Sequence, residues 1–277
     1  MVKRSRGVSG GWRERAMPHI VLILFSLYIG LPPLWVLRTS FVPDSLAYQA
    51  VLLPDFTFEN YIKLFAKHNF GLAYRVSFMA AAGSTLLALP LAAMTGYAFA
   101  RYRTGGTLGR FIVLATQMLP PVALVLPVFA LFRVMGMTNS ITGLIIAYAG
   151  LNLPFLTWIL MGFFEGVPIE LEWAAQVDGG TPWDAFWRIV LPVSLPGIAA
   201  AAVLGFILAW NEFLFALILT GPTTATIPVS LAGLQSQNGV QIAEVSAGVV
   251  LGVAPLLIAS RFIQRHLVQG LTFGAVK

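Results

Sequence analysis

Residues 170–180 read ELEWAAQVDGG, and residues 188–196 read RIVLPVSLP. Both stretches belong to Glu165–Pro196, a polar segment of about thirty residues that separates two long apolar runs. Apolar runs of this length bury themselves in a core or a bilayer, whereas a polar segment between them must leave it. We therefore interpret Glu165–Pro196 as a structured loop that protrudes from an apolar helical bundle.

The loop is predicted to contain two short helices. Pro168–Val177 forms the first helix, and the Asp-Gly-Gly turn at 178–180 offers the positive φ angles that end it. Thr181 can cap the second helix, with Pro182 at its first position and Asp184 at its third, close to a capping box.

The second helix is predicted to end at Pro192 and to carry an apolar face. The residues of this face are Trp183, Phe186, Trp187 and Ile189. The sequence leaves two alternatives open for the face. It docks on another protein, or it folds back and packs on its own bundle at the membrane surface.

The composition identifies an integral membrane protein. Of the 277 residues, 58% are hydrophobic and 10% are charged, and the mean hydropathy of +0.82 lies far outside the range of soluble domains. The chain has no cysteine, which excludes disulfides and thiolate chemistry. Its three histidines, His19, His68 and His266, have no ligand-like spacing, so no metal site is predicted.

Six apolar runs are long enough to cross a bilayer core of about 30 Å as helices. They are Met17–Leu37, Leu72–Ala100, Phe111–Phe132, Gly143–Phe164, Gly197–Leu219 and Ile242–Ile263. These runs are continuous and lack the alternation of barrel strands. We predict an all-α polytopic membrane protein with one domain over residues 1–277, with its six-helix membrane region at 17–263.

The basic residues predict the orientation of the bundle. With six spans both termini lie on one side, and that side carries twelve of the Lys and Arg residues against five on the other. By the positive-inside rule, the N-terminal segment 1–16, the loop 165–196 and the tail 264–277 are cytoplasmic. The net charge of +6 therefore reflects topology, and nucleic-acid binding is not predicted.

The loop resembles the EAA loop of permease subunits from binding-protein-dependent ABC importers, whose pattern is EAA, two residues, DG and later I-x-LP. Trp173 stands at the glutamate of EAA, with Glu172 one residue earlier, as in members that read EEAA. The matching residues are Glu172, Ala174, Ala175, Asp178, Gly179, Ile189, Leu191 and Pro192. Three further stretches look like the second permease of maltose-type sugar importers: 58–61 (FENY), 209–213 (AWNEF) and 262–277.

The resemblance implies a transport subunit of a prokaryotic cytoplasmic membrane. Its implied partners are two ATPase subunits, a homologous permease, an extracytoplasmic solute-binding protein and a carbohydrate. In similar permeases the loop forms a coupling helix lodged in a cleft of an ATPase subunit, where Gly179 would allow close approach. No glycine precedes any of the four lysines, so the chain has no Walker A sequence. ATP and Mg²⁺ would be bound by the partner ATPases, and no cofactor is expected here.

Two further regions are candidates for contacts with those partners. The outer segment Thr39–Gly71 is a candidate docking surface for the binding protein, or a plain surface loop. The tail Gly270–Lys277 is a candidate for contact with the ATPases, since Gly270 and Gly274 permit an extended course. A frayed terminus is the alternative.

The translocation path is predicted from polar residues inside spans, which are costly in lipid. Asn211 and Glu212 lie well inside the fifth predicted span and are flanked by aromatic candidates for a sugar path. The candidate path residues are Trp210, Asn211, Glu212 and Phe213. Gln117 and Asn152 are weaker candidates, with interhelical hydrogen bonds as the alternative.

The leading interpretation is the transmembrane subunit of an ATP-driven sugar importer that works by alternating access. An importer of an amino acid, phosphate, a polyamine or another solute is the rival within transport, because the EAA pattern does not specify the cargo. An intramembrane enzyme is disfavoured, because no GxSxG, HExxH or close aspartate pair occurs. A channel would have no use for the EAA loop.

Overall fold

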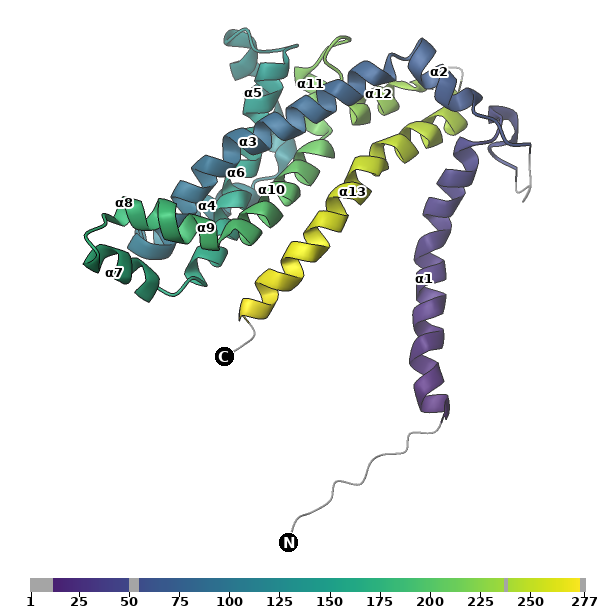
Figure 1. The fold of residues 1–277 in the computed structure, drawn as a ribbon. Coiled ribbons are helices and arrows are strands. Elements are labelled where there is room, and N and C mark those ends of the chain that lie inside the picture. The colour runs from purple at the N-terminus through teal and green to yellow at the C-terminus, as the bar shows by residue number, and fades with distance from the viewer. Residues whose placement is uncertain (1–11, 50–54, 237–238, 275–277) are drawn as a thin grey trace.

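The computed structural model describes residues 12–49, 55–236 and 239–274 of the chain (Figure 1). These residues are almost entirely helical, which confirms the predicted all-α fold. Strand pairing within them is limited to two antiparallel two-residue strands, β1 (Gln235–Ser236) and β2 (Gly239–Val240).

Within the part of the chain that the structure describes, four helices are individually long and apolar enough to cross a membrane. They are α1 (Trp12–Ser40), α3 (Phe70–Tyr102), α6 (Ile141–Glu165) and α13 (Ile242–Gly274). They correspond to the first, second, fourth and sixth predicted spans. Among the described residues the number of spans rises to six if each of two bent helix pairs counts as one span.

The third predicted span, Phe111–Phe132, is wrong as a continuous helix. The chain forms α4 (Gly106–Met118) and α5 (Pro121–Val134), which are bent by 92° relative to each other. The break coincides with Pro120 and Pro121, which lack the amide donors that a continuous helix needs.

The fifth predicted span, Gly197–Leu219, is also interrupted. Helix α10 (Leu195–Trp210) ends before Asn211, and α11 (Leu214–Leu219) begins after a short non-helical stretch. The expectation that Asn211 and Glu212 lie well inside a continuous helix is therefore wrong. They occupy a helix break instead.

The last helix is longer than predicted. Helix α13 continues past Ile263 to Gly274, so Gly270 and Gly274 lie in a helix and not in an extended tail. The extended course expected for Gly270–Lys277 is wrong for residues 270–274. Residues 275–277, like residues 1–11 of the predicted N-terminal segment, lie outside the described residues.

Short elements connect the long helices. Between α6 and α10 lie α7 (Glu170–Val177), α8 (Pro182–Ala185), the π-helical turn η2 (Phe186–Val190) and α9 (Leu191–Val193). The segment Thr39–Gly71 holds a 3-10 turn, η1 (Asp44–Leu46), and α2 (Glu59–Lys67), while α12 (Ile227–Gly233) follows α11.

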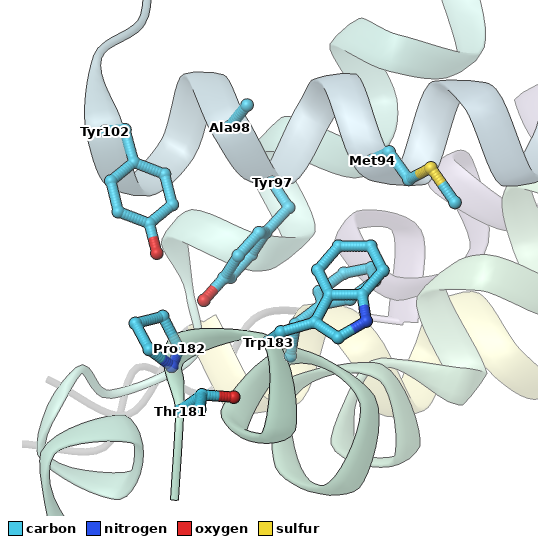
Figure 2. Close-up of a pocket in the computed structure, with 8 residues that line it drawn as sticks. Met94, Tyr97, Ala98, Tyr102, Thr181, Pro182 and Trp183 are labelled. Atoms are coloured by element: carbon cyan, nitrogen blue, oxygen red, sulfur yellow. The ribbon is translucent and has the colours of Figure 1, made fainter. Parts of the chain in front are cut away.

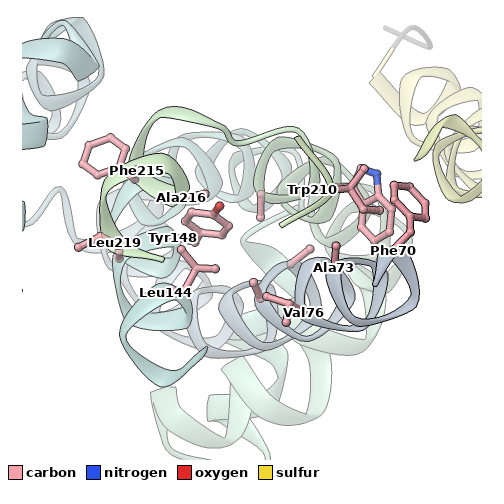
Figure 3. Packing of buried hydrophobic residues seen from close by; sticks show 14 of the residues in the cluster. Phe70, Ala73, Val76, Leu144, Tyr148, Trp210, Phe215, Ala216 and Leu219 are labelled. Atoms are coloured by element: carbon pink, nitrogen blue, oxygen red, sulfur yellow. The ribbon is translucent and has the colours of Figure 1, made fainter. Parts of the chain in front are cut away.

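Helices α3, α6 and α10 pack closely because small residues line their contacts. A Cβ atom on Gly96 of α3 would lie 3.0 Å from the Thr157 carbonyl oxygen and 3.0 Å from the Met161 amide of α6. Larger apolar side chains fill the opposite end of the bundle, where Tyr148 and Trp210 pack among the residues of α3, α6 and α11 (Figure 3).

Helix α1 stands apart from the bundle for most of its length (Figure 1), and the apolar 18-residue stretch that qualifies it as a span is not buried. Its C-terminal end is nevertheless fixed. The Asn60 side-chain amide of α2 donates to the carbonyl oxygens of Ser40 (3.0 Å) and Val42 (2.8 Å). The Ala243 amide of α13 donates to the Asp44 carboxylate at 3.1 Å. These contacts join α1, α2 and α13 at one end of the molecule.

Candidate functional site

The predicted glycine turn is present between α7 and α8. Gly179 has a φ of +88°, a conformation that L side chains rarely adopt. No described atom lies within 4 Å of the position that a Cβ would take there, so the turn is open on that side. Gly180 has a different reason to be glycine, because its Cβ would lie 2.8 Å from the Ala175 carbonyl oxygen.

The predicted capping box at the start of α8 is confirmed. The Asp184 amide donates to the Thr181 hydroxyl oxygen at 3.1 Å, and the Thr181 amide donates to the Asp184 carboxylate at 3.0 Å. The Thr181 hydroxyl donates to the same carboxylate at 2.6 Å, and these hydrogen bonds lower the pKa of Asp184.

The second helix ends at Val193, one residue after the predicted end at Pro192. The helix changes to the π-helical turn η2 at Phe186, and α9 then continues to Val193. Around Ser194 the chain bends by 74° into α10, so the loop runs almost directly into this membrane helix. Pro192 lies near the start of α9, where its missing amide hydrogen is tolerated.

The apolar face of the second loop helix was expected either to dock on another protein or to pack on its own bundle, and each alternative holds for part of it. Phe186 is buried, and its ring lies 4.6 Å from that of Tyr97 and 6.3 Å from that of Phe164. Trp183 and Trp187 remain 58% and 44% exposed. Part of this face therefore folds back on the bundle, and the rest stays available to another protein. Trp183 and Tyr97 border a mostly apolar hollow of about 390 Å³ (Figure 2).

Glu172, which lies one residue before the position of the motif's glutamate, points into the protein and is 4% exposed. One of its oxygens accepts a hydrogen bond from the Tyr97 hydroxyl at 2.5 Å, and the other accepts from the Arg101 guanidinium. Arg101 also donates to the Val167 carbonyl oxygen at 2.7 Å. No local pattern in the sequence predicts this contact, because α3 and α7 are far apart along the chain.

The outward side of α7 is apolar. Trp173 is 56% exposed, and Ile169 and Val177 are exposed one helical turn before and after it. Ala174, Asp178 and Gly179 are exposed as well, whereas Ala175 is half-buried. In the second helix Ile189 and Leu191 are half-buried and Pro192 is exposed. The structure thus brings the predicted loop residues together in one protruding unit.

The predicted path residues lie at the far end of α10, about 24 Å from the loop at 1.5 Å per helical residue. Trp210 is buried and does not line a surface. Its indole donates to the Gly252 carbonyl oxygen at 3.0 Å, and its ring stacks on Phe206 and meets Tyr74 edge-on. Asn211 and Phe213 are exposed.

Glu212 has a structural role that the sequence analysis missed. Its carboxylate accepts hydrogen bonds from the amides of Phe215 (3.0 Å) and Ala216 (3.1 Å), which are otherwise free at the start of a helix. Glu212 thereby stabilises the restart of the chain as α11. The sequence signal for this role was the polar pair Asn211-Glu212, which an apolar run follows directly.

The two weaker candidates make interhelical hydrogen bonds. The Asn152 side-chain amide of α6 donates to the Gly205 carbonyl oxygen of α10 at 3.1 Å. The Gln117 side-chain amide of α4 donates to the Leu151 carbonyl oxygen of α6 at 3.3 Å. These bonds support the structural alternative for both residues.

The sequence matches the model of one known protein family. Residues 88–273, more than half of the chain, match the family described as "Binding-protein-dependent transport system inner membrane component". The protein belongs to this family of transporter permeases, which are not enzymes. Together with the apolar helices, membership makes it a multi-pass inner-membrane protein.

Individual relatives are named as permeases. The trehalose transport system permease protein SugB of Mycobacterium tuberculosis is 36% identical over 265 residues, covering 92% of this chain and 96% of the relative. The trehalose/maltose transport system permease protein MalG of Thermococcus litoralis is 31% identical over 275 residues, covering 96% and 99%.

The fold also matches a solved structure. A chain of a bacterial ABC transporter involved in the import of the acidic polysaccharide alginate superimposes with a TM-score of 0.75. The match covers 94% of this chain and 99% of that chain at 21% sequence identity.

Proposed function

We propose that this chain is the transmembrane permease subunit of an ATP-driven importer that moves a sugar across the cytoplasmic membrane by alternating access. The proposal rests mainly on the direct connection of the loop to helix α10. The protruding loop leads through one bend into a helix whose far end carries the polar break. The trehalose, trehalose/maltose and alginate transporters among its relatives support a carbohydrate cargo.

The loop is proposed to be the coupling element. It would dock on one of two partner ATPase subunits, which bind ATP and Mg²⁺. The exposed apolar side chains of Ile169, Trp173 and Val177, together with the open turn at Gly179, form a surface suited to a protein partner. The excess of basic residues supports placing the loop and both termini in the cytoplasm.

A homologous permease is proposed to complete the bundle. Helix α1 supports this proposal, because its exposed apolar stretch needs either lipid or another subunit around it. The end of the molecule formed by α2 and the β1–β2 hairpin would receive an extracytoplasmic binding protein. The alginate transporter has been solved with its sugar-bound periplasmic protein. Gly270 and Gly274, at the end of α13, are proposed to approach the ATPases.

The helix break between α10 and α11 is proposed to line the translocation path. Non-helical backbone at membrane depth is tolerated where protein buries it or where it borders a water-filled cavity. Asn211 and Phe213 are exposed at this break, and Glu212 holds its geometry. Discontinuous helices of this kind form substrate sites in other membrane transporters.

Cysteine labelling tests the path in this cysteine-free chain. We expect Asn211→Cys and Phe213→Cys to react with a membrane-impermeant thiol reagent at rates that change between nucleotide-free and ATP-bound complexes. Phe215→Cys serves as the control, because Phe215 is buried beside the same break and its thiol should stay unreactive. Equal, slow labelling of all three positions in both states would place the path elsewhere.

A further inference from the structure

One turn of α3 holds the loop by a buried ion pair. Tyr97 and Arg101 are four residues apart and therefore lie on the same face of α3. Both donate hydrogen bonds to the Glu172 carboxylate of α7, and Arg101 also binds the Val167 carbonyl oxygen that precedes α7. The side chains of Glu172 and Arg101 are 6% and 9% exposed. Buried, hydrogen-bonded charges of this kind fix the relative position of two helices.

The same turn of α3 also contacts the second loop helix. The Tyr97 ring lies 4.6 Å from the ring of Phe186 in η2 and 6.0 Å from that of Phe164 at the end of α6. Ala185 and Phe186 are buried at this contact. Both helices of the loop are thus attached to α3.

The other end of α3 contacts the helix break. The Tyr74 ring meets the Trp210 ring edge-on at 5.4 Å, and Trp210 is the last residue of α10 before the break. Tyr74 and Tyr97 are separated by about 35 Å along one unbroken helix. Helix α3 therefore connects the loop to the last residue of α10, next to the break, without following the length of α10.

The covalent route through α10 is less direct. Between the loop and α10 the chain changes to a π-helical turn at Phe186–Val190 and then bends by 74° around Ser194. The regular α-helix is therefore interrupted between the loop and α10, whereas α7 is joined directly to α3 by a buried charged contact.

We propose that Glu172 is a positioning residue that transmits the movement of the loop into α3, and through Tyr74 and Trp210 to the helix break. This inference rests on the proposed coupling function of the loop. In this arrangement Glu172 acts inside the permease, while Trp173, at the position of the motif's glutamate, faces the ATPase.

The test removes both charges together, so that no single charge remains buried without a partner. The double variant Glu172→Gln/Arg101→Gln is combined with Asn211→Cys and assembled with the ATPases and the second permease. We expect ATP hydrolysis to continue. The nucleotide-dependent change in labelling at position 211, and the amount of sugar transported per ATP, should fall by roughly fivefold or more.

A second ion pair provides a matched control. Arg110 of α4 and Glu165 of α6 are 3.1 Å apart, but their side chains are 29% and 44% exposed. The variant Glu165→Gln should keep both readouts at the wild-type level, because it removes only this partly exposed pair and leaves the hydrogen bond from Arg110 to the Phe99 carbonyl oxygen of α3 in place.

Two outcomes would overturn the inference. One is a Glu172→Gln/Arg101→Gln complex with the wild-type labelling change and transport per ATP. The other applies if that variant does not assemble. Tyr97→Phe, which deletes a single hydrogen bond to Glu172, is then tested in its place, and an unchanged labelling response overturns the inference. A wild-type complex with no nucleotide-dependent labelling would instead contradict the proposed function.

Discussion

Substitution of Gly179 by valine should separate the permease from its ATPases while leaving the membrane bundle folded. The φ of +88° at this residue strains a β-branched side chain by about 1–3 kcal/mol, and the strain falls on the turn that orders α7 and α8. No described atom lies within 4 Å of the new Cβ, so the bundle itself is not disturbed. We expect wild-type insertion, loss of copurified ATPase subunits and at least a roughly tenfold loss of transport.

The matched control at this position is Gly179→Asn, because asparagine adopts positive φ angles far more readily than valine. We expect it to keep most of the ATPase association. The measurement is the ratio of ATPase to permease after affinity purification, followed by uptake in proteoliposomes. A valine variant that retains the ATPases and transports at the wild-type rate would contradict the assigned role of the turn.

Substitution of Gly96 by leucine should prevent the bundle from assembling. Its Cβ alone would lie 3.0 Å from two backbone atoms of α6, so α3 and α6 must separate to accept the side chain. Overpacking typically costs about 1–3 kcal/mol, and backbone atoms leave little room to relax. We expect a lower thermal midpoint in detergent and a loss of the monodisperse species in size-exclusion chromatography.

Gly162→Leu is the control for this prediction. Gly162 lies on α6, close in sequence to the contact with Gly96, but no described atom lies within 4 Å of its Cβ position. The same side chain should therefore be tolerated there. Equal stability of the two variants would show that the close approach of α3 and α6 is not required for folding.

Hydropathy alone predicted most of the bundle, because a bilayer dictates the length of a spanning helix. The prediction from hydropathy was wrong where prolines or polar residues interrupt the helix within an apolar run. The Pro120-Pro121 pair bends the third span, and the residues at 211–213 interrupt the fifth. A hydropathy average over twenty residues shows neither interruption. A search for proline pairs and for polar residues before apolar runs would have found both.

The loop was predictable because its signals are local. The glycine turn and the capping box each depend on residues within four positions of one another, and both are present in the structure. The partner of Glu172 was not predictable, because Arg101 is 71 residues away and its position depends on the packing of α3 against α6. The burial of Trp210 depends in the same way on α3 and α13.

Uptake in a reconstituted system tests whether the chain imports a sugar with energy from partner ATPases. Proteoliposomes would contain this chain, its co-encoded second permease and its ATPases, with the co-encoded binding protein outside. We expect uptake of the sugar that the binding protein binds in calorimetry, and this uptake should require both internal ATP and the binding protein. A binding protein that recognises an amino acid or phosphate instead of a sugar, or uptake that proceeds without ATP, would contradict the proposed function.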